Sequence, residues 1–579
     1  MKFKALSEIP RNVPADPMNP SKCQAYGFLW QTCHNGGEER KLLTYIPQSV
    51  ENNDRCIVIA PPENVDVERF LEETELIGFA EKNRCFLSIL IPENNQWNLQ
   101  GKDADFLNAA YKKVQSREAY VVMQDCIYLV GFGKGATVAQ QAAMKMSSEW
   151  AGLATFGNFE PNVLLNAGLC RDSDEGIQED EMYISASKTQ LPVWMFLEEK
   201  DELAENTADY WKKQNKNQKD SLYDRYGTEI FLAPNIQKTS KINSEQISQT
   251  CITAGPGRSK VNAQVLDYMW SYIGAARRHR CYGEKVLRYY RDPRKNGASY
   301  HRLVVDGFLR EWFEYVPESL NKSEDPVPLV IVLHGRGGNG ETFFDITDMS
   351  VMAEERGFIA VFPTADFYEF KKTGLKNLRL WQGNFEGRQM DSVPFIRTMI
   401  QDIQSRLSVD PGRIYACGQS SGGYMTTYLA LAASEVFAAV SPWSAYTYPG
   451  SKHEVFKCFE GKCFADGHVP ICLLFGDKDQ IFGTDAKNFL HAESSDINGF
   501  VRFIIESYGL EPEPYTYKCP PIQYFVWKNK KGTPMLKIGI VQNMPHANYA
   551  EESRIAYDEF FSKFSKAGGK LKYMGRDAK

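Results

Sequence analysis

The sequence predicts an α/β protein built from two tandem domains, each a mostly parallel sheet with helices on both faces. Two observations lead to this class. Residues 413–432 read as a short buried strand, a glycine-rich turn and a helix, and the order of landmarks in the first half returns in the second at near-constant spacing. Of the 579 residues, 43% are hydrophobic and 24% charged, so each half can bury a full core. We expect domains at residues 1–278 and 298–579, with residues 279–297 as the linker.

The turn in this strand–turn–helix unit carries a G-x-S-x-G motif at residues 418–422. Its flanking glycines let the backbone turn sharply, so the hydroxyl of Ser420 is expected to project above the C-terminal edge of a sheet. A serine hydroxyl is a weak nucleophile at neutral pH. The motif therefore predicts chemistry only if a base, a group that orients the base and an oxyanion hole accompany it.

A base and an acid follow the motif in the chain. The strand-like residues 469–475 lead to Asp477 and Asp479, and the order and position expected of a Ser-His-Asp triad favour Asp479. Two histidines follow this strand. His546 lies in a loop before the final helix, whereas His491 lies in an amphipathic segment typical of the surface. We predict His546 as the base and Asp479 as the acid that orients it, a set suited to acyl transfer through an acyl-enzyme.

A candidate oxyanion loop precedes the motif. The apolar residues 328–333 predict a buried strand, and the sequence H-G-R-G-G follows at residues 334–338. Such loops present backbone N–H groups to a carbonyl oxygen that becomes negative. We predict the N–H groups of Arg336 and Ser421 as the two donors, with His334 supporting the loop by hydrogen bonding.

Three aromatic residues are candidates for the walls of an acyl pocket: Trp381, Tyr424 and Trp443. An ordinary core position is at least as compatible with each of them taken singly. The substrate mouth is expected to form from loops, which set specificity on such scaffolds; the candidate segments are residues 366–385, 443–468 and 508–531.

Residues from about 300 to 564 resemble the polyhydroxybutyrate depolymerase-like and feruloyl esterase group of α/β-hydrolases. The resemblance rests on residues 309–317, the H-G-x-G-G loop, residues 353–363, the G-x-S-x-G motif and the M-P-H sequence at 544–546. It implies an α/β-hydrolase fold and hydrolysis of esters that carry feruloyl or other aromatic, acetyl or hydroxyalkanoate acyl groups. One departure is Phe475, which stands where members often carry a histidine before the glycine of the acid loop.

The first half reads as a copy of the second whose catalytic positions have been replaced. Residues 44–50 correspond to residues 314–320, and residues 130–135 to residues 417–422. In this correspondence Gly133 stands at the serine position and Gly257 at the histidine position, and only Asp201 is retained. The oxyanion loop becomes Ala60-Pro61-Pro62, and a proline has no N–H to donate. We predict a hydrolase-like domain without activity.

The role of this first half is left open by the sequence. The favoured role is structural support of the second half. The alternatives are shaping of the active-site mouth, homo-oligomer formation through this domain, and binding of a polymer or glycan. Between the halves, residues 275–280 and 288–295 form a basic stretch, which predicts a solvated connector. The net charge of −6 and the pI near 5.9 give no basic footprint for nucleic acid.

The composition also leads to expectations about the cellular location of the protein and about metals and cofactors. The N-terminus lacks the apolar core of a signal peptide, and no apolar run approaches a membrane span, so we expect a cytoplasmic protein without a membrane partner. Several of the 13 cysteines fall on predicted core strands, which favours a reducing compartment. Cys458 and Cys463 lack a second ligand pair at zinc spacing, and no dinucleotide fingerprint stands out. We expect neither metal nor cofactor, and a small-molecule or oligomeric ester as the binding partner.

Three functions are compatible with these patterns. The first is a serine carboxylic ester hydrolase. The second is a polysaccharide- or partner-binding scaffold protein with incidental esterase activity, in which the first half does the binding. The third is a serine peptidase of the same fold, which shares the triad; the absence of a propeller-like domain or an acidic pocket for an amino terminus makes it the least favoured.

Overall fold

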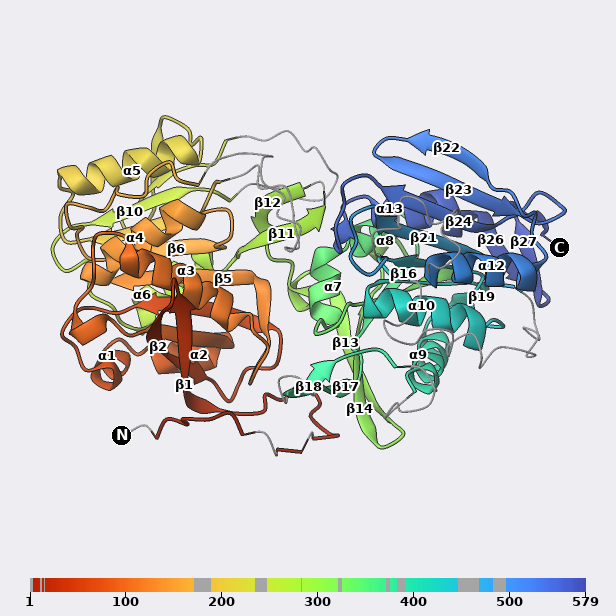
Figure 1. The fold of residues 1–579 in the computed structure, drawn as a ribbon, viewed down its shortest axis with the longest axis horizontal. Coiled ribbons are helices and arrows are strands. Elements are labelled where there is room, and N and C mark those ends of the chain that lie inside the picture. Colours follow the sequence, from red (N-terminus) through yellow and green to blue (C-terminus); the bar gives the residue numbers. More distant parts are fainter. Residues whose placement is uncertain are drawn as a thin grey trace.

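The computed structural model of the chain describes residues 4–10, 13–14, 16–170, 189–234, 247–282, 284–320, 325–370, 375–382, 391–445, 468–482 and 496–578. The chain forms two lobes that lie side by side, the first half in red to yellow and the second in green to blue (Figure 1). Each lobe contains one large sheet with helices packed against it. The predicted fold class is therefore confirmed.

The two large sheets have ten strands each, in the same spatial order. The first runs β1 (Gly27–Asn35), β2 (Glu38–Ile46), β4 (Cys85–Leu90), β3 (Asp54–Ala60), β5 (Val122–Phe132), β6 (Gly152–Phe156), β7 (Val193–Leu197), β10 (Thr250–Ala254), β9 (Glu229–Phe231) and β8 (Ser221–Tyr223). The second runs β13 (Ala298–Val305), β14 (Phe308–Tyr315), β16 (Ile359–Pro363), β15 (Val327–Leu333), β19 (Val409–Gln419), β20 (Ala439–Trp443), β21 (Ile471–Gly476), β24 (Pro534–Val541), β23 (Ile522–Lys528) and β22 (Tyr515–Cys519). The central strands pair in parallel, and antiparallel strands close both edges. The repeat read from the sequence is thus a repeat of topology.

Helices cover both faces of the first sheet because its central strands are apolar on both sides. In β3, Cys56 and Val58 belong to one buried cluster, and Ile57 and Ile59 belong to the cluster on the other face. The helices of the first half are α1 (Val67–Glu73), α2 (Leu76–Asn83), α3 (Lys102–Val114), α4 (Lys134–Met146), α5 (Glu202–Gln214) and α6 (Ala263–Ile273). Helices α3, α4 and α5 contribute to the first cluster, and α1, α2 and α6 to the second.

The second half has one continuous core around its sheet. Its described helices are α7 (Gly340–Ile346), α8 (Met349–Arg356), α9 (Val393–Arg406), α10 (Ser421–Ala432), α12 (Asp496–Tyr508) and α13 (Glu552–Arg554), the last continued by a π-helical turn (Ile555–Phe560). Two small sheets complete it: β17 (Phe367–Phe370) with β18 (Leu375–Arg379), and β26 (Phe564–Ala567), β27 (Lys570–Tyr573) and β28 (Arg576–Asp577). None of the helices in the described parts of the chain is both long and apolar enough to cross a membrane.

The segment between the halves is a β-hairpin. Strands β11 (Ala276–Tyr282) and β12 (Glu284–Tyr289) pair with each other, and β11 also pairs in parallel with β25 (Asn548–Tyr549) of the second half. The expectation of a solvated connector is wrong for its arginines, because Arg277, Arg278 and Arg288 are all buried. Arg277 forms ion pairs of 2.6 Å with Asp125 of the first half and 2.6 Å with Asp345 of the second. Through these two ion pairs Arg277 joins the halves, while Arg278 donates to backbone carbonyls of the first half.

Candidate active site

Ser420 lies at the tip of a tight turn between β19 and α10. Its φ of 55° and ψ of −116° are unusual for a non-glycine residue, a conformation that costs on the order of 1–3 kcal/mol. The glycines on either side permit this turn. A Cβ atom would lie 2.5 Å from the carbonyl oxygen of Leu333 at Gly418, and 2.0 Å from it at Gly422. Both positions therefore require glycine for the close approach of the turn to β15.

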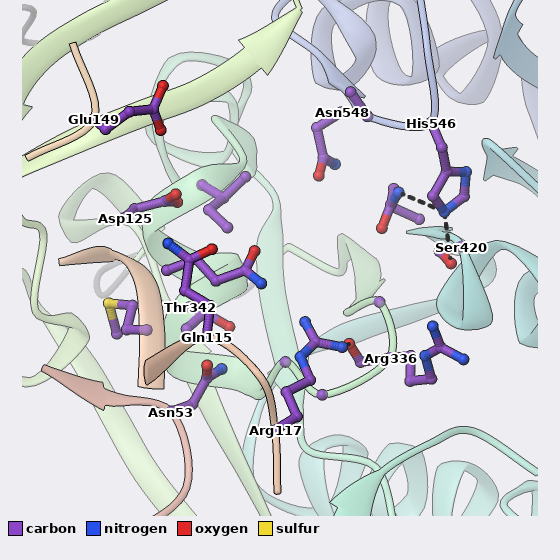
Figure 2. Close-up of a pocket in the computed structure, with 18 of the residues that line it drawn as sticks. Asn53, Gln115, Arg117, Asp125, Glu149, Arg336, Thr342, Ser420, His546 and Asn548 are labelled. Carbon is purple, nitrogen blue, oxygen red and sulfur yellow. Dashed lines mark hydrogen bonds between the residues drawn. The ribbon is translucent and has the colours of Figure 1, made fainter. Parts of the chain in front are cut away.

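His546 hydrogen-bonds both other members of the predicted triad. Its Nε2 atom lies 2.9 Å from Oγ of Ser420, and its Nδ1 atom lies 3.0 Å and 3.1 Å from the two carboxylate oxygens of Asp479. Figure 2 shows the contact between His546 and Ser420 at one end of a pocket. Asp479 is fully buried, whereas the side chain of His546 is 27% exposed. With Nδ1–H donating to Asp479, Nε2 is left to accept the proton of Ser420.

The competing carboxylate, Asp477, has a different task. Its Oδ1 atom accepts a hydrogen bond of 2.7 Å from the backbone N–H of Asn543, which fixes the loop before His546. The two loops are further joined by a bond of 3.1 Å from Lys478 N–H to the carbonyl of Met544. Gly476 packs so closely there that a Cβ atom would lie 1.7 Å from the Met544 oxygen. Since β21 and β24 are neighbours, their loops bring Asp479 and His546 together.

His334 holds the glycine loop that follows β15. Its Nε2 atom accepts a hydrogen bond of 2.9 Å from the N–H of Ala365, and Nδ1 lies 2.7 Å from the carbonyl of Gly335. Burial lowers the pKa of His334 to about 3, so the ring is neutral and Nδ1 carries the proton. The N–H of Gly337 donates to the carbonyl of Arg379 over 2.8 Å, which fixes the far side of the loop. His334 is a support, as expected.

The two residues predicted to supply oxyanion donors are Arg336 and Ser421, and Ser421 directly follows Ser420 in the chain. Arg336 lines the same pocket as Ser420 and His546. Ser421 is the first residue of α10, where backbone N–H groups have no acceptor within the helix. The arrangement suits a carbonyl oxygen that gains negative charge next to Ser420.

The three aromatic residues predicted to wall an acyl pocket are buried and do not line the pocket that the described residues form around Ser420. Trp381, Tyr424 and Trp443 are each at most 1% exposed, and none lines the pocket around Ser420. Trp381 donates from Nε1 to the carbonyl of His334 over 2.9 Å, and the carbonyl of Trp443 accepts from the N–H of Ser420 over 2.9 Å. Trp381 therefore supports the loop at His334 through its ring, and Trp443 supports the turn at Ser420 through its backbone carbonyl. The residue type alone does not reveal these contacts.

The pocket that contains Ser420 and His546 lies between the two halves and has a volume of about 800 Å³. The second half contributes the glycine loop, part of α7 and the residues after His546, while the first half contributes residues around the ends of α3 and α4. Sequence reasoning missed the residues of the first half, and those drawn in Figure 2 include Asn53, Gln115, Arg117 and Glu149. The predicted mouth segment 508–531 instead forms the edge hairpin β22–β23. Most of residues 443–468, as well as Cys458, Cys463 and His491, lies outside the described residues.

The equivalent place in the first half has a turn of the same shape without the reactive groups. Gly133 follows β5 and precedes α4, with φ of 54° and ψ of −129°. Pro62 packs against it, 3.4 Å from where a Cβ atom would stand. Asp201, the retained carboxylate, caps the N-terminus of α5 through a bond of 2.8 Å from Ala204 N–H. Within the described ranges, no cluster of three or more histidine, cysteine and carboxylate side chains is arranged to hold a metal ion.

Comparison with known proteins finds a family match in the second half of the chain. Residues 314–463 match the family model described as "Esterase PHB depolymerase". The second half carries a domain of this esterase family. The resemblance to this esterase group is therefore confirmed for that region. The match begins at the end of β14, continues beyond β20 and includes the G-x-S-x-G turn.

Individual relatives agree with the domain match. A feruloyl esterase B of Thermothelomyces thermophilus is 27% identical over 138 residues, which cover 24% of this chain and 45% of the relative. A poly(3-hydroxyalkanoate) depolymerase C of Paucimonas lemoignei is 22% identical over 246 residues, 41% of this chain and 58% of the relative. The chain thus spans about half the length of these curated relatives. Among solved structures, an acetyl xylan esterase from Aspergillus awamori is 15% identical and covers 46% of this chain and 99% of its own, with a TM-score of 0.34.

Proposed function

We propose that the protein is a serine carboxylic ester hydrolase whose reaction runs through an acyl-enzyme on Ser420. The observation that carries the proposal is the hydrogen-bonded series from Ser420 through His546 to the buried Asp479. Feruloyl or other aromatic, acetyl and hydroxyalkanoate esters are the proposed acyl classes, because the similar proteins include feruloyl esterases, an acetyl xylan esterase and a poly(3-hydroxyalkanoate) depolymerase.

The first half of the reaction forms the acyl-enzyme. Nε2 of His546 takes the hydroxyl proton as Oγ of Ser420 bonds to the ester carbonyl carbon, and the carbonyl oxygen becomes an oxyanion next to the N–H groups of Arg336 and Ser421. The bond to the alcohol oxygen then breaks, and His546 returns the proton to the leaving alcohol. Asp479 holds the ring in the required tautomer and stabilises the imidazolium.

The second half releases the acid. A water molecule gives a proton to His546 while its oxygen attacks the acyl carbon, and a second oxyanion forms in the same place. Oγ of Ser420 then leaves and regains the proton from His546. The net reaction consumes one ester and one water molecule, yields one acid and one alcohol, and needs no further reactant.

The test is hydrolysis of a substrate panel by the full chain, by Ser420→Ala and by Ser405→Ala. The panel contains acetyl, feruloyl, hydroxybutyrate-oligomer and peptide substrates. Ser405 is a matched control because it lies on α9 and its hydroxyl only donates to the carbonyl of Asp402. We expect Ser420→Ala to lose about 10⁴-fold or more in kcat on at least one ester class, with Ser405→Ala unchanged. Ester turnover that survives in Ser420→Ala, or turnover of peptides alone, contradicts the proposal.

A further inference from the structure

The wall of the active-site pocket opposite the catalytic residues is built by the first half of the chain. Arg117 is the part of this wall that reaches the glycine loop. It lies in the segment after α3, and Nη1 is placed 3.4 Å from the carbonyl oxygen of Arg336. A Cβ atom at Gly337 would lie 3.2 Å from Cζ and Nη1 of Arg117. The guanidinium therefore packs directly on the loop that is proposed to receive the oxyanion, as Figure 2 shows for the labelled Arg117 and Arg336.

The backbone conformation of Arg117 is strained. Its φ of 54° lies in the left-handed region, where glycine or asparagine is usual and other residues carry strain. Among the described residues it has no ion pair with a carboxylate, and the only hydrogen bond of its guanidinium is the long one to Arg336. Desolvation, followed by repulsion from Arg336, lowers the pKa of Arg117 to about 10, which still leaves it charged at neutral pH. Arg117 is thus a strained, partly buried cation at the pocket that pairs with no carboxylate among the described residues, and such a cation can be completed by an anionic ligand.

The other charges in the pocket do not supply that partner. The carboxylates that line it, Asp125 and Glu149, lie away from Ser420 and His546 at the opposite end of the view (Figure 2). Asp125 is neutralised by Arg277 at 2.6 Å, and Glu149 lies 3.4 Å from the hydroxyl of Tyr111. Among the described lining residues, both carboxylates therefore lie at the far end of the pocket from Ser420, while Arg117 lies on the side of the glycine loop.

We propose that Arg117 binds a negatively charged oxygen group of the ester substrate, a carboxylate or a phosphate, while Ser420 attacks the ester. The proposal rests on the proposed esterase function and names a substrate class for it: esters with an anionic group on the acyl or the alcohol part. The planar guanidinium fork matches the two oxygens of such a group. The first half is then a specificity element for the second, although it has no catalytic residues of its own.

The volume of the pocket agrees with a substrate larger than a single small acyl group. A space of about 800 Å³ that reaches from Ser420 to the first half is of the size that takes a drug-sized ligand. Its lining is mixed rather than apolar, with Asn53, Gln115 and Lys112 beside Arg117. A polar substrate with an anionic group fits this lining better than an unfunctionalised aliphatic ester does.

Two matched substrate pairs test the proposal. On the alcohol side, we compare the acetyl esters of 4-hydroxybenzoate and 4-hydroxybenzamide; on the acyl side, the 4-nitrophenyl esters of hemisuccinate and of succinate monomethyl ester. Each pair differs by one negative charge. We expect the wild type to have a higher kcat/KM for the charged ester in at least one pair, and this preference to fall as salt is added.

The variants separate binding from support of the loop. Arg117→Gln should lower kcat/KM for the preferred charged ester by about 10- to 100-fold, mainly through KM, and leave the neutral ester within about 2-fold. Arg117→Lys keeps the charge without the fork and should recover part of the loss. Arg69→Gln, at an exposed ion pair on α1, is the matched control and should change nothing.

The possible contrary results distinguish failure of the role of Arg117 from failure of the esterase function. An equal loss on charged and neutral esters in Arg117→Gln, or no charge preference in either pair, overturns the role of Arg117 while the esterase function stands. Turnover of the neutral esters that does not depend on Ser420 overturns the esterase function first, and the proposal with it. Thermal unfolding of each variant shows whether it is folded, and if Arg117→Gln is not, Arg117→Lys alone decides.

Discussion

Ser420 and Gly133 adopt nearly the same backbone conformation at the same place in two sheets of identical strand order. Their φ and ψ are 55° and −116° for Ser420, and 54° and −129° for Gly133. The turn that presents Ser420 therefore has nearly the same shape as a turn of the first half that carries a glycine at the corresponding position. Shape and chemistry are separable on this scaffold, and each can be tested by itself.

The first prediction concerns the acid. Asp479→Asn should lower kcat on the preferred ester by about 10³- to 10⁴-fold, because the amide no longer holds His546 in the tautomer that accepts the serine proton. Asp477→Asn should stay within about 3-fold of wild type, since the carboxylate that hydrogen-bonds His546 is Asp479, whereas Asp477 accepts from the backbone N–H of Asn543. Steady-state kinetics of the two variants decide between the carboxylates, and a larger loss in Asp477→Asn would contradict the assignment.

The second prediction concerns the elbow glycines. Gly422→Ala places a Cβ atom 2.0 Å from the carbonyl oxygen of Leu333, so we expect a loss of about 1–3 kcal/mol or more in the free energy of unfolding, together with loss of activity. Gly499→Ala is the matched control, because Gly499 lies in α12 with nothing within 4 Å of its Cβ position. It should stabilise the protein by about 0.5–1 kcal/mol. Equal effects in urea unfolding would refute the close-approach argument.

The third prediction concerns the buried ion pairs of the connecting hairpin. Arg277→Ala removes the 2.6 Å ion pairs to the buried Asp125 and Asp345, and should cost about 3–5 kcal/mol in the free energy of unfolding. Arg69→Ala removes an exposed ion pair and should cost no more than about 1 kcal/mol. For the same reason residues 280–579 alone, which lack Arg277, should be less stable than the full chain. Urea titration of these three proteins provides the measurement, and comparable stability in all of them argues against coupled halves.

The fourth prediction concerns pH. The pKa of His334 is lowered from 6.5 to about 3 in the folded state, so the unfolded state binds a proton more readily. The stability that His334 contributes is therefore complete above about pH 6.5 and is lost as the pH falls, by about 1.4 kcal/mol per pH unit until about pH 3. Unfolding at pH 7, 6 and 5 should show a shallower slope for His334→Gln than for wild type. The exposed His34→Gln serves as control, and unchanged slopes would contradict the burial argument.

The sequence predicted those features that are local or ordered along the chain. The strand before Ser420, the helix after it and the loops of Asp479 and His546 each have a signature within a few residues, and the tandem repeat follows from their order. The site assignments from sequence coincide with the hydrogen bonds of His546. Their catalytic roles remain predictions.

The features that sequence reasoning missed depend on partners far apart in the chain. The burial of Arg277 follows from Asp125 and Asp345, which lie in different halves. Trp381 and Trp443 have the chemistry of pocket residues, but the direction of each ring is set by the strand or loop that carries it. Arg117 gave no local signal beyond its position after a helix, because its neighbour Gly337 lies 220 positions away in the other half.

The most direct test of the account is to trap the covalent intermediate. The full chain is treated with a fluorophosphonate, which reacts with activated serine hydroxyls, and the labelled residue is located by mass spectrometry. We expect one label on Ser420, absent from Ser420→Ala, slowed by at least about 10²-fold in His546→Ala, and unchanged in Ser405→Ala. A label elsewhere, or none on Ser420 in the folded wild-type protein, would contradict the claim that Ser420 is the nucleophile.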